Sequence, residues 1–428
     1  MSSITIHSSI VSGTMQAPPS KSCMQRVCAA ALLKGGETVI ENYGISNDDK
    51  AAIEITKQLG ADLKFEDNKL IINSKFSIIN NQQSIINIDC GESGLSLRMF
   101  TPIAALLNQE ILITGEGSLL NRPIDFFDEI LPQLDVKVET KNGKLPINIK
   151  GALQPQNIEI DGSLSSQFLT GLLFAYSYKK ENAIIKVNNL KSKPYIDLTL
   201  QVMEDFGLNV PVNKDYKEFV FSQYPIPNTQ YPVNYTIEGD WSNASFLLVA
   251  GAIAGEITVA GLNINSTQAD KAIIDVLKKV GCKLLITASE ISVATSAVGL
   301  NAFSFDATHC PDLFPPLVAL ASCCNGVSTI KGVTRLLHKE SNRAISLQQE
   351  FGKMGVTITI DNDTMFIEGT RNIQANKVNS HNDHRIAMAC AVAALKANGN
   401  MFIENAHAIN KSYPNFYDDL KGLGAIVA

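Results

Sequence analysis

Basic side chains recur at regular intervals along this chain. Arg122 and Lys193 are 71 residues apart, Lys193 and Lys339 are 146 apart, and Lys339 and Lys411 are 72 apart. Lysine and arginine bind phosphates and carboxylates through charge-assisted hydrogen bonds. The spacing therefore predicts that the four cations occupy equivalent positions in the repeats of one fold. Cations gathered at equivalent positions would bind an anionic ligand.

A second set of polar side chains opens the apolar helical segments that the sequence predicts. Backbone N–H groups at a helix N-terminus attract anions, and serine hydroxyls and guanidinium groups add further donors. Together the two sets predict a site for a small molecule with several negative charges, although any single cation could also be a solvated surface charge. The second set comprises Lys21, Ser22, Arg26, Arg98, Ser165, Ser166, Gln167, Asp312, Asp383, His384 and Arg385.

Two other chemistries fit the same residues less well. His381 and His384 flank Asp383 without a third ligand at a recognisable spacing, so a capping carboxylate and a hydrogen-bonding imidazole are favoured over a metal site. The pair at 165–166 could supply a serine nucleophile, but no histidine is nearby in the sequence. A serine that binds phosphate is the simpler interpretation.

The elements that must carry these residues repeat about every 72 residues. Each repeat combines an apolar helix, a short β-branched strand and a second, amphipathic helix. In four repeats the second helix is expected to end at a glycine C-cap, at Gly60, Gly207, Gly281 and Gly355. The six strands are GETVIEN (36–42), QEILITG (109–115), NAIIKVN (182–188), GEITVAG (255–261), GVSTIKG (326–332) and GNMFIEN (399–405).

Two further strands follow in the first five repeats, so that each repeat is a βαβαββ-like module in an α/β fold. Asp240, Asp312 and Asp383 open the apolar helices of the last three repeats only, which suggests three repeats per domain. We expect one domain at 20–239 and a discontinuous second domain at 1–19 plus 240–428. The N-terminal strand ITIHSS is expected to supply the edge that the last repeat lacks.

Composition narrows the class of protein. The 428 residues carry a formal charge of −6 and no long basic run, which disfavours a nucleic-acid binder. No secretory signal and no apolar run of membrane-spanning length is evident. The eight cysteines lack CxxC pairing and are expected to be reduced, buried thiols, although neighbouring cations could activate Cys23 or Cys28 as a nucleophile. We expect a soluble, cytoplasmic protein without nucleic-acid or membrane partners.

Ten motifs run in order along nearly the whole chain: APPSKSCMQR (17–26), DCGESGLSLR (89–98), NRPI (121–124), DGSLSSQF (161–168), KSKPYID (191–197), EGD (238–240), PD (311–312), HKESNR (338–343), NDHRIAM (382–388) and NKSYPNF (410–416). They resemble the 5-enolpyruvylshikimate-3-phosphate synthase family. The related UDP-N-acetylglucosamine enolpyruvyl transferases share the repeat fold, but their loop carries a cysteine ahead of Arg-Pro that residues 115–123 lack.

The resemblance implies two similar domains of three βαβαββ repeats each, an inverse α/β barrel-like fold, with the active site in the interdomain cleft. It implies a monomer that needs no metal and no cofactor. The implied reaction transfers the enolpyruvyl group of phosphoenolpyruvate to the 5-hydroxyl of shikimate 3-phosphate by addition and elimination. Phosphate is released, in the shikimate pathway to aromatic amino acids.

The resemblance also implies roles for individual residues. Glu340 matches the acid, and later base, at the methylene carbon, Asp312 lies at the 5-hydroxyl, and Lys21 lies at the bridging oxygen of the phosphate. Arg98, His384 and Glu92 are expected to support them. The shikimate 3-phosphate contacts are Lys21, Ser22, Arg26, Ser165, Ser166, Gln167, Ser192, Tyr195, Asp312 and Lys339. The phosphoenolpyruvate contacts are Lys21, Gly94, Arg122, Gln167, Arg343, Arg385 and Lys411.

Four positions depart from the commonest family pattern. Glu92, Leu95 and Met99 stand where the family usually has Asn, Thr and Pro, and Arg335 stands where an Asn often helps to bind the shikimate phosphate. A carboxylate beside the phosphate of phosphoenolpyruvate would repel it unless Glu92 is turned toward a cation.

Two alternative functions remain open. A relative acting on another phosphorylated acceptor is disfavoured by the Ser-Ser-Gln run at 165–167 and the Lys-Pro-Tyr run at 193–195. A ring-forming, non-catalytic clamp built from similar α/β units would need a continuous basic inner face. The net charge of −6 disfavours that alternative.

Overall fold

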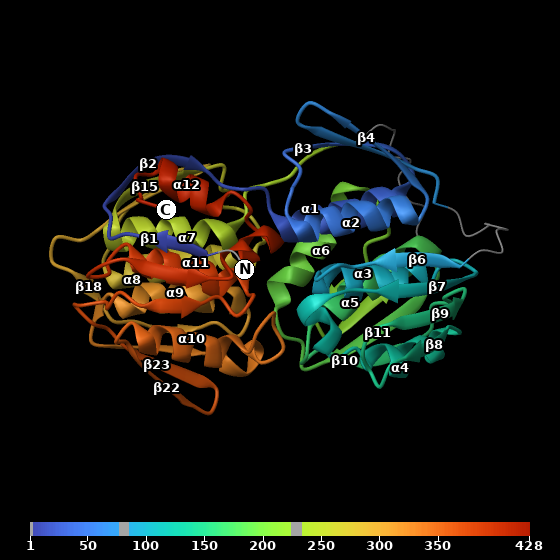
Figure 1. The fold of residues 1–428 in the computed structure, drawn as a ribbon. Helices are drawn as coiled ribbons and strands as arrows, with labels where there is room; N and C mark the ends of the chain where they lie inside the picture. Colours follow the sequence, from blue (N-terminus) through green and yellow to red (C-terminus); the bar gives the residue numbers. More distant parts are fainter. Residues whose placement is uncertain (1–2, 77–84, 224–232) are drawn as a thin grey trace. The chain divides into compact units, whose positions relative to one another are not determined.

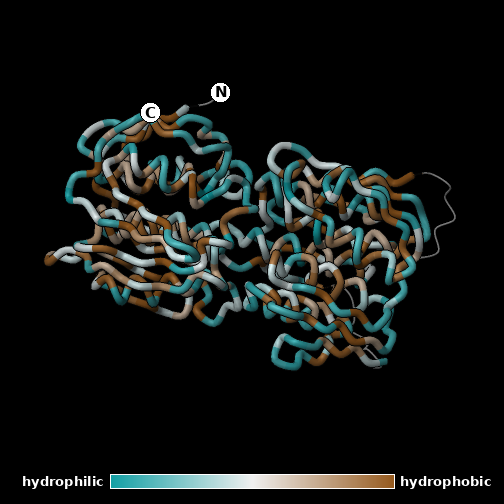
Figure 2. Tube along the Cα trace, turned by 90° about the horizontal axis from the view of Figure 1, so that it is seen from below, coloured by the Kyte–Doolittle hydropathy of each residue, from teal (hydrophilic) through white to brown (hydrophobic). Residues whose placement is uncertain are grey.

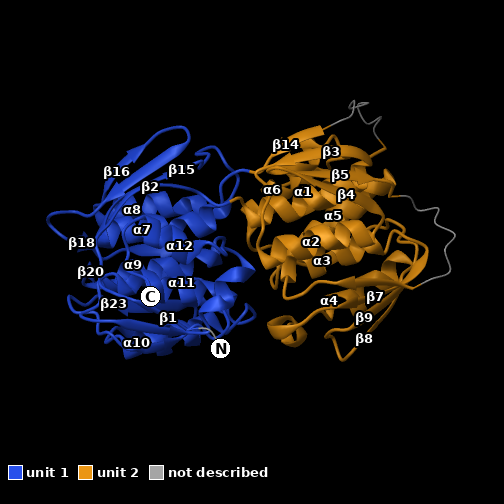
Figure 3. Ribbon diagram, turned by 45° about the horizontal axis from the view of Figure 1, so that its top comes forward, with its two compact units in different colours: residues 1–18, 238–428 blue, residues 19–237 orange. Residues whose placement is uncertain are grey.

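The computed structural model describes residues 3–76, 85–223 and 233–428, and Figure 1 shows their fold. The chain divides into two compact units, coloured separately in Figure 3. Unit 1 consists of Met1–Pro18 and Glu238–Ala428, and unit 2 is the continuous segment Pro19–Ile237.

Unit 2 alternates helices with strands along its length. Its elements are α1 (Lys21–Lys34), β3 (Gly36–Glu41), α2 (Asn47–Gln58), β4 (Ala61–Glu66), β5 (Lys69–Ser74), β6 (Ile86–Asp89), α3 (Gly94–Ala104), β7 (Gln109–Thr114), η1 (Gly117–Asn121), α4 (Phe126–Ile130), η2 (Leu131–Leu134), β8 (Lys137–Thr140), β9 (Ile147–Gly151), β10 (Ile158–Asp161), α5 (Ser166–Lys179), β11 (Ala183–Asn188), α6 (Lys193–Asp205), β12 (Val212–Lys214), β13 (Glu218–Phe221) and β14 (Val233–Thr236).

Unit 1 follows the same plan. Its elements are β1 (Ser3–Ile6), β2 (Val11–Gln16), α7 (Trp241–Ala254), β15 (Gly255–Ala260), η3 (Ala269–Ala272), α8 (Ile273–Val280), β16 (Lys283–Ile286), β17 (Glu290–Ala294), β18 (Leu300–Asn301), β19 (Ser304–Asp306), η4 (Pro311–Leu313), α9 (Phe314–Ser322), β20 (Cys324–Asn325), β21 (Val327–Lys331), η5 (Val333–Leu336), α10 (Arg343–Lys353), β22 (Thr357–Asp361), β23 (Thr364–Glu368), β24 (Lys377–Asn379), α11 (His384–Ala394), β25 (Met401–Glu404), η6 (Ala406–Lys411) and α12 (Phe416–Gly422).

The sheets repeat one topology. In unit 2 the strand orders are β14-β3-β5-β4, β6-β7-β9-β8 and β10-β11-β13-β12. The first two strands of each sheet are parallel, and the third and fourth form an antiparallel hairpin. Unit 1 repeats this order in β2-β15-β17-β16 and β19-β21-β23-β22. The six repeated strands expected from the sequence are β3, β7, β11, β15, β21 and β25, so that expectation is confirmed.

Three strands are paired with sequence-distant partners. β2 directly precedes α1 of unit 2 but pairs in parallel with β15 of unit 1, and β14 directly precedes α7 of unit 1 but pairs in parallel with β3 of unit 2. The last repeat is completed by β1, which pairs antiparallel with β25 from Ser3↔Glu404 to Ile6↔Met401. The N-terminal strand therefore supplies the missing edge, as the sequence predicts.

Each unit has three central helices that pack on one another, α1, α3 and α5 in unit 2 and α7, α9 and α11 in unit 1. The sheets lie outside these helices (Figure 1). All 14 residues of α7 are buried, which explains why its sequence is apolar on every side. The strands show the alternation of a sheet with one covered face, visible as changing hydropathy along the tube in Figure 2.

Local signals fix where the outer helices end. Gly60, Gly207, Gly281 and Gly355 follow or cap α2, α6, α8 and α10 with positive φ angles of 105°, 63°, 86° and 79°. Glycine adopts this left-handed conformation without the steric cost that a side chain would bring. The four predicted C-terminal glycines are thus confirmed. Within the described part of the chain, no helix is both long and apolar enough to span a membrane.

Candidate functional sites

The N-termini of the three central helices of unit 2 are tied together by side chains. Ser93 and Ser96 of the first turn of α3 both donate their hydroxyls to Oε1 of Gln25 on α1, at 3.1 and 3.0 Å. Arg98 on α3 donates through Nη1 to Oε1 of Gln167 on α5, at 3.0 Å. The predicted residues of these three segments, far apart in sequence, therefore belong to one cluster.

Two guanidinium groups of this cluster lie over Gly94. A Cβ atom at Gly94 would lie 2.6 Å from Nη1 of Arg122 and 2.9 Å from Nη1 of Arg98, so a larger residue here would have to displace one or both guanidinium groups. Arg122 is buried, and its Nη2 donates to the hydroxyl of Ser118 at 3.3 Å. Two cations beside the first turn of α3 favour binding of an anion.

Arg26 is fully buried and is held by neutral acceptors. It donates to the hydroxyl of Thr199 at 2.9 Å and to the carbonyl oxygens of Ser22 and Tyr195 at 2.7 and 3.2 Å. Burial lowers the pKa of Arg26 to about 10, so the group keeps its charge at neutral pH. Arg26 thereby joins the predicted residues of α1 to those of α6.

The hydroxyl residues of the cluster lie at helix N-termini, as expected. Ser165 is the N-cap of α5 and accepts from the backbone N–H of Gln167 at 3.2 Å, and Ser166 is the first residue of that helix. Ser192 precedes α6 with a left-handed φ of 56° and is buried. The N-terminal backbone of α5 and that of α6 thus carry the serines predicted to bind phosphate.

Lys21 forms an ion pair that the sequence interpretation missed. Its Nζ lies 2.8 Å from Oδ2 of Asp48, with both side chains largely buried. Asp48 is in the first turn of α2. The repeat spacing gives no signal for it, because the residue 72 positions before Arg122 is Lys50. The carboxylate fixes the direction of the Lys21 amine.

In unit 1, Asp312 is the centre of a second cluster. Its Oδ1 accepts from Nη1 of Arg343 at 2.8 Å and from Nζ of Lys339 at 3.3 Å, and its Oδ2 accepts from Nη2 of Arg385 at 3.1 Å. Burial alone would raise the pKa of Asp312, but the charges of Arg385, Lys339 and Arg343 outweigh it and hold the pKa well below its ordinary value. The carboxylate is therefore ionised while these cations surround it.

Arg343 connects Asp312 to two more carboxylates. Its Nε donates to Oδ2 of Asp383 at 2.8 Å, and its Nη2 contacts Oε2 of Glu340. Burial opposes the charge of Arg343, but Asp383, Glu340 and Asp312 raise its pKa above the ordinary value. Burial also lowers the pKa of Lys339. Asp312, Glu340 and Asp383 thus share three cations, which makes this a compact network of alternating charges.

Asp270 is a buried carboxyl group of the same region that the sequence interpretation missed. Burial raises its pKa to about 6, the charge of Asp312 adds to the rise, and Arg385 opposes it. The hydroxyl of Ser242 donates to its Oδ2. Asp270 lies in η3, and the repeat spacing of the four cations does not lead to it, because 72 residues before Lys339 is position 267.

The remaining predicted residues of unit 1 lie around α11. Asp383 is its N-cap and accepts from the backbone N–H of Arg385 at 3.0 Å. His384 is buried, with Nδ1 3.9 Å from Oδ1 of Asp383. Lys411, at the end of η6, donates to the carbonyl oxygen of Asn382 at 2.6 Å. Over the described ranges, no group of three or more His, Cys, Asp or Glu side chains is placed to hold a metal ion.

Three expectations need correction or refinement. Asp312 opens the helical segment η4–α9 as expected, but unlike Asp240 it makes no side-chain cap, and its carboxylate accepts from cations instead. The Nζ of Lys193 lies 5.1 Å from the centre of the Tyr216 ring, so an aromatic face is one partner of this cation. The expected burial of all cysteines is incomplete, since Cys282 and Cys323 are half-buried.

Burial argues against a cysteine nucleophile near the first cluster. It raises the pKa of the Cys28 thiol above its ordinary value, and the neighbouring charge of Asp49 raises it further. A thiol with a raised pKa is a poor nucleophile at neutral pH. Cys28 therefore fits the role of a small core residue, which the sequence interpretation preferred.

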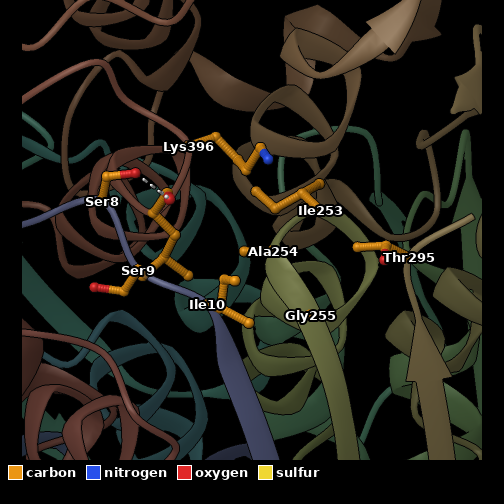
Figure 4. Close-up of a pocket in the computed structure, with 9 residues that line it drawn as sticks. Ser8, Ser9, Ile10, Ile253, Ala254, Gly255, Thr295 and Lys396 are labelled. Carbon is orange, nitrogen blue, oxygen red and sulfur yellow. Dashed lines mark hydrogen bonds between the residues drawn. The ribbon is translucent and has the colours of Figure 1, made fainter. Parts of the chain in front are cut away.

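A hollow of about 350 Å³ in unit 1 lies apart from the Asp312 cluster (Figure 4). It is found at the C-terminal ends of α7 and α11, whereas Arg385 is at the N-terminal end of α11, and 11 helical residues span about 16 Å. Helix C-termini present carbonyl oxygens, which disfavour anions. The lining residues are Ser8, Ser9, Ile10, Ile253, Ala254, Gly255, Thr295, Leu395 and Lys396.

Comparison with known proteins identifies the family of this chain. The family model for EPSP synthase (3-phosphoshikimate 1-carboxyvinyltransferase) matches residues 6–420. A 3-phosphoshikimate 1-carboxyvinyltransferase of Clostridium perfringens is 37% identical over 100% of this chain and 99% of its own length, and one of Clostridium novyi is 35% identical over 100% and 98%.

Solved structures share the fold. An EPSP synthase from Acinetobacter baumannii superposes with a TM-score of 0.81 at 21% identity, covering 100% of both chains. The enolpyruvyl transferase NikO from Streptomyces tendae gives a TM-score of 0.77 at 17% identity, covering 100% of this chain and 98% of its own. The expected enolpyruvyl transferase fold and the family resemblance are both confirmed: the chain belongs to the EPSP synthase family, the 3-phosphoshikimate 1-carboxyvinyltransferases.

Proposed function

We propose that this protein transfers the enolpyruvyl group of phosphoenolpyruvate to the 5-hydroxyl of shikimate 3-phosphate and releases phosphate, as a step of the shikimate pathway. The observation that carries the proposal is the pair of cation clusters, one in each unit, built from the residues that match the family motifs. Both substrates carry a carboxylate and a phosphate, and buried cations bind such groups strongly.

We assign the two clusters to different parts of this task. Arg26, with its neutral partners, retains a full positive charge for the phosphate of shikimate 3-phosphate, and Ser165, Ser166 and Ser192 supply hydroxyl donors near it. Arg122 beside Gly94 supports binding of the phosphate of phosphoenolpyruvate. Arg343, Arg385 and Lys411 of unit 1 supply cations for the same small anion.

Asp312 is the base that we assign to the 5-hydroxyl. A carboxylate that is held ionised by three cations is a weak base, since its pKa is depressed. An anionic substrate competes for Arg343, Arg385 and Lys339, and each cation that turns to the substrate raises the pKa of Asp312. Substrate binding therefore prepares the base that removes the hydroxyl proton.

The transfer requires balanced proton movements. In the addition step a C–O bond forms between the 5-oxygen and the enol carbon, Asp312 takes the hydroxyl proton, and Glu340 protonates the methylene carbon. In the elimination step Glu340 takes a proton back from that carbon, the double bond re-forms and the bond to phosphate breaks. Lys21, oriented by Asp48, stabilises the charge on the leaving phosphate.

Two further properties belong to this proposal. We assign the chain to the cytoplasm as a monomer, supported by the net charge of −6 and by the reduced state of its cysteines. Light scattering at micromolar concentration tests the monomer, and a mass of twice 46.4 kDa would refute it.

Phosphate release by the purified protein tests the reaction. We expect release from phosphoenolpyruvate only when shikimate 3-phosphate is present, and none with UDP-N-acetylglucosamine. Mass spectrometry should find the acceptor heavier by the enolpyruvyl group. A folded sample that releases phosphate with neither acceptor, and binds neither, would overturn the proposal.

A further inference from the structure

Glu92 lies in the turn before α3 and points at a neighbouring loop. Its Oε2 accepts from the backbone N–H of Ser118 at 3.0 Å. The carbonyl oxygen of Gly91 accepts from the backbone N–H of Glu116 at 2.7 Å. Two hydrogen bonds therefore tie the segment 91–92 to the segment 116–118, and the second segment leads directly into Arg122.

We propose that Glu92 is a positioning residue, which sets the place of Arg122 by holding the backbone at Gly117 and Ser118. The inference rests on the function proposed above, in which Arg122 binds phosphoenolpyruvate. It gives the departure of Glu92 from the usual asparagine a structural reason. The carboxylate is directed at a backbone donor.

Ser118 connects Glu92 to Arg122. Its backbone N–H is bound by the carboxylate of Glu92, and its hydroxyl accepts from Nη2 of Arg122 at 3.3 Å. The backbone N–H of Arg122 donates to the carbonyl oxygen of Leu119 at 3.2 Å. A displacement of Ser118 therefore moves the guanidinium that lies over Gly94.

The absence of a side chain at Gly117 leaves room for the carboxylate of Glu92. Its φ is +55°, and a Cβ at this position would overlap Oε2 and Cδ of Glu92. The side chain of Glu92 thus occupies the space that any larger residue at position 117 would need. Length as well as charge is required of Glu92, since a shorter acid cannot reach the N–H of Ser118 from the same backbone position.

The test compares Glu92→Asp with Glu92→Gln. Aspartate keeps the charge and loses the reach, whereas glutamine keeps the reach and an acceptor oxygen and loses the charge. Loss of a hydrogen bond to a charged group corresponds to about a 10- to 100-fold change in affinity. For Glu92→Asp we expect a rise of about that size in KM for phosphoenolpyruvate, with a much smaller change in kcat and in KM for shikimate 3-phosphate. We expect Glu92→Gln to lie between Glu92→Asp and the wild type.

The opposite order would overturn the inference. If Glu92 acts through repulsion of the substrate phosphate, then Glu92→Gln lowers KM for phosphoenolpyruvate and Glu92→Asp resembles the wild type. Equal rises in both KM values, with a parallel fall in kcat, would mean that the variants damage the fold and not the position of Arg122.

A double-mutant cycle sharpens the result. Gly117→Ala pushes on the carboxylate of the wild type, but much less on the shorter side chain of Glu92→Asp. We expect the effects on KM for phosphoenolpyruvate to be clearly less than additive. Strict additivity would show that Glu92 and Gly117 act independently, against the inference.

Amide hydrogen exchange separates this inference from the proposed function. Exchange in the segment 116–121 should be faster in Glu92→Asp than in the wild type, whether or not the protein has the proposed activity. Unchanged exchange contradicts the positioning role even in an active enzyme. Faster exchange in a protein without shikimate 3-phosphate-dependent phosphate release would overturn the function and keep the structural role.

Discussion

At the scale of one residue, the protonation state of Asp312 is set by the cations of the unit 1 cluster. Three cations hold its pKa well below the ordinary value, although burial alone would raise it. The surrounding charges balance, because Glu340 and Asp383 share Arg343 with Asp312. A ligand that brings its own anions must replace at least one of these carboxylates as the partner of a cation.

Replacing Asp312 with asparagine keeps the shape and removes the base. We expect kcat to fall by about 10²- to 10⁴-fold, the usual contribution of general base catalysis, with KM for phosphoenolpyruvate unchanged or lower because its cations lose a competitor. Steady-state phosphate release measures both constants.

The matched control for this variant is Asp306→Asn. Asp306 is an aspartate of the same unit that is largely exposed beside Lys331. We expect both its constants to stay within about twofold of the wild type, as is usual for exposed ion pairs. An Asp312→Asn enzyme that is equally active would remove Asp312 from the proposed mechanism.

At the scale of elements, helix packing positions the cluster of unit 2. Gly171 of α5 lies against α3, where an added Cβ would be 2.7 Å from the carbonyl oxygen of Arg98 and 2.8 Å from that of Met99. Gly352 in the last turn of α10 has open space around the same position. Gly171 is therefore closely packed against backbone, whereas Gly352 has room for a side chain.

Alanine at these two positions should act with opposite sign. Gly171→Ala forces α3 and α5 apart and should cost about 1–3 kcal/mol of unfolding free energy, with lower activity because Arg98 and Gln167 separate. Gly352→Ala should stabilise the protein by about 0.4–1 kcal/mol, since it restricts the unfolded chain. Thermal unfolding of both variants checks the signs, and a stable, fully active Gly171→Ala would refute the close approach.

The N-terminus of α2 makes stability depend on pH. Asp49 completes a capping box with Ser46, and its Oδ1 has no hydrogen-bond partner among the described residues. Burial raises the pKa of Asp49 to about 7 from an ordinary value of 3.8. Because ionisation of Asp49 is harder in the folded state, it lowers the free energy of unfolding. This loss is absent below about pH 4, grows up to about pH 7 and is constant above it.

Asp49→Asn removes this titration. The difference in unfolding free energy, variant minus wild type, should be roughly 2–4 kcal/mol larger at pH 8 than at pH 4. Urea unfolding at the two pH values measures the difference. Asp62→Asn, at an exposed ion pair with Lys75, serves as the control and should show no comparable change. A constant difference for Asp49→Asn would contradict the raised pKa.

At the scale of the whole molecule, the two units differ in how the chain builds them. Unit 2 is one continuous segment, whereas unit 1 needs residues 1–18 for β1 and β2 at the edges of its sheets. The N-terminal strand also lies beside the C-terminus, since the N–H of Thr5 donates to the carbonyl oxygen of Ala428 at 2.8 Å.

This asymmetry predicts which fragments fold. Residues 19–237 expressed alone should show a cooperative urea transition, because all their sheets are complete. Residues 238–428 alone should aggregate, since β15 and β25 lose a neighbour and expose edges. Joining residues 1–18 after Ala428 through a short glycine linker should restore a cooperative transition in that fragment. Failure of the joined fragment, with 238–428 folding alone, would contradict the role of the two strands.

Much of this architecture could be predicted from the sequence, because local signals carry it. The left-handed glycines after the outer helices depend on neighbouring residues, and the 72-residue period shows directly in the sequence as recurring strand and helix patterns. The partners of Lys21 and Glu92 could not be predicted in the same way. Asp48 and Ser118 are 27 and 26 residues away in sequence, and they meet Lys21 and Glu92 only because tertiary packing brings loops to helix N-termini. Asp270 could not be predicted for the same reason, since Asp312 comes from another repeat and Ser242 is 28 residues away in sequence.

The pairing of β1 with β25 also means that β1 is synthesised long before its partner strand. β1 ends at Ile6 and β25 begins at Met401, so a ribosome that adds about 5–20 residues per second needs about 20–80 s between them. Unit 2 can finish folding within that interval, while the first strand of the chain waits without its partner. β1 therefore stays unpaired for most of the time in which residues 7–400 are made, and a chaperone that binds exposed strands has the longest time to act on it.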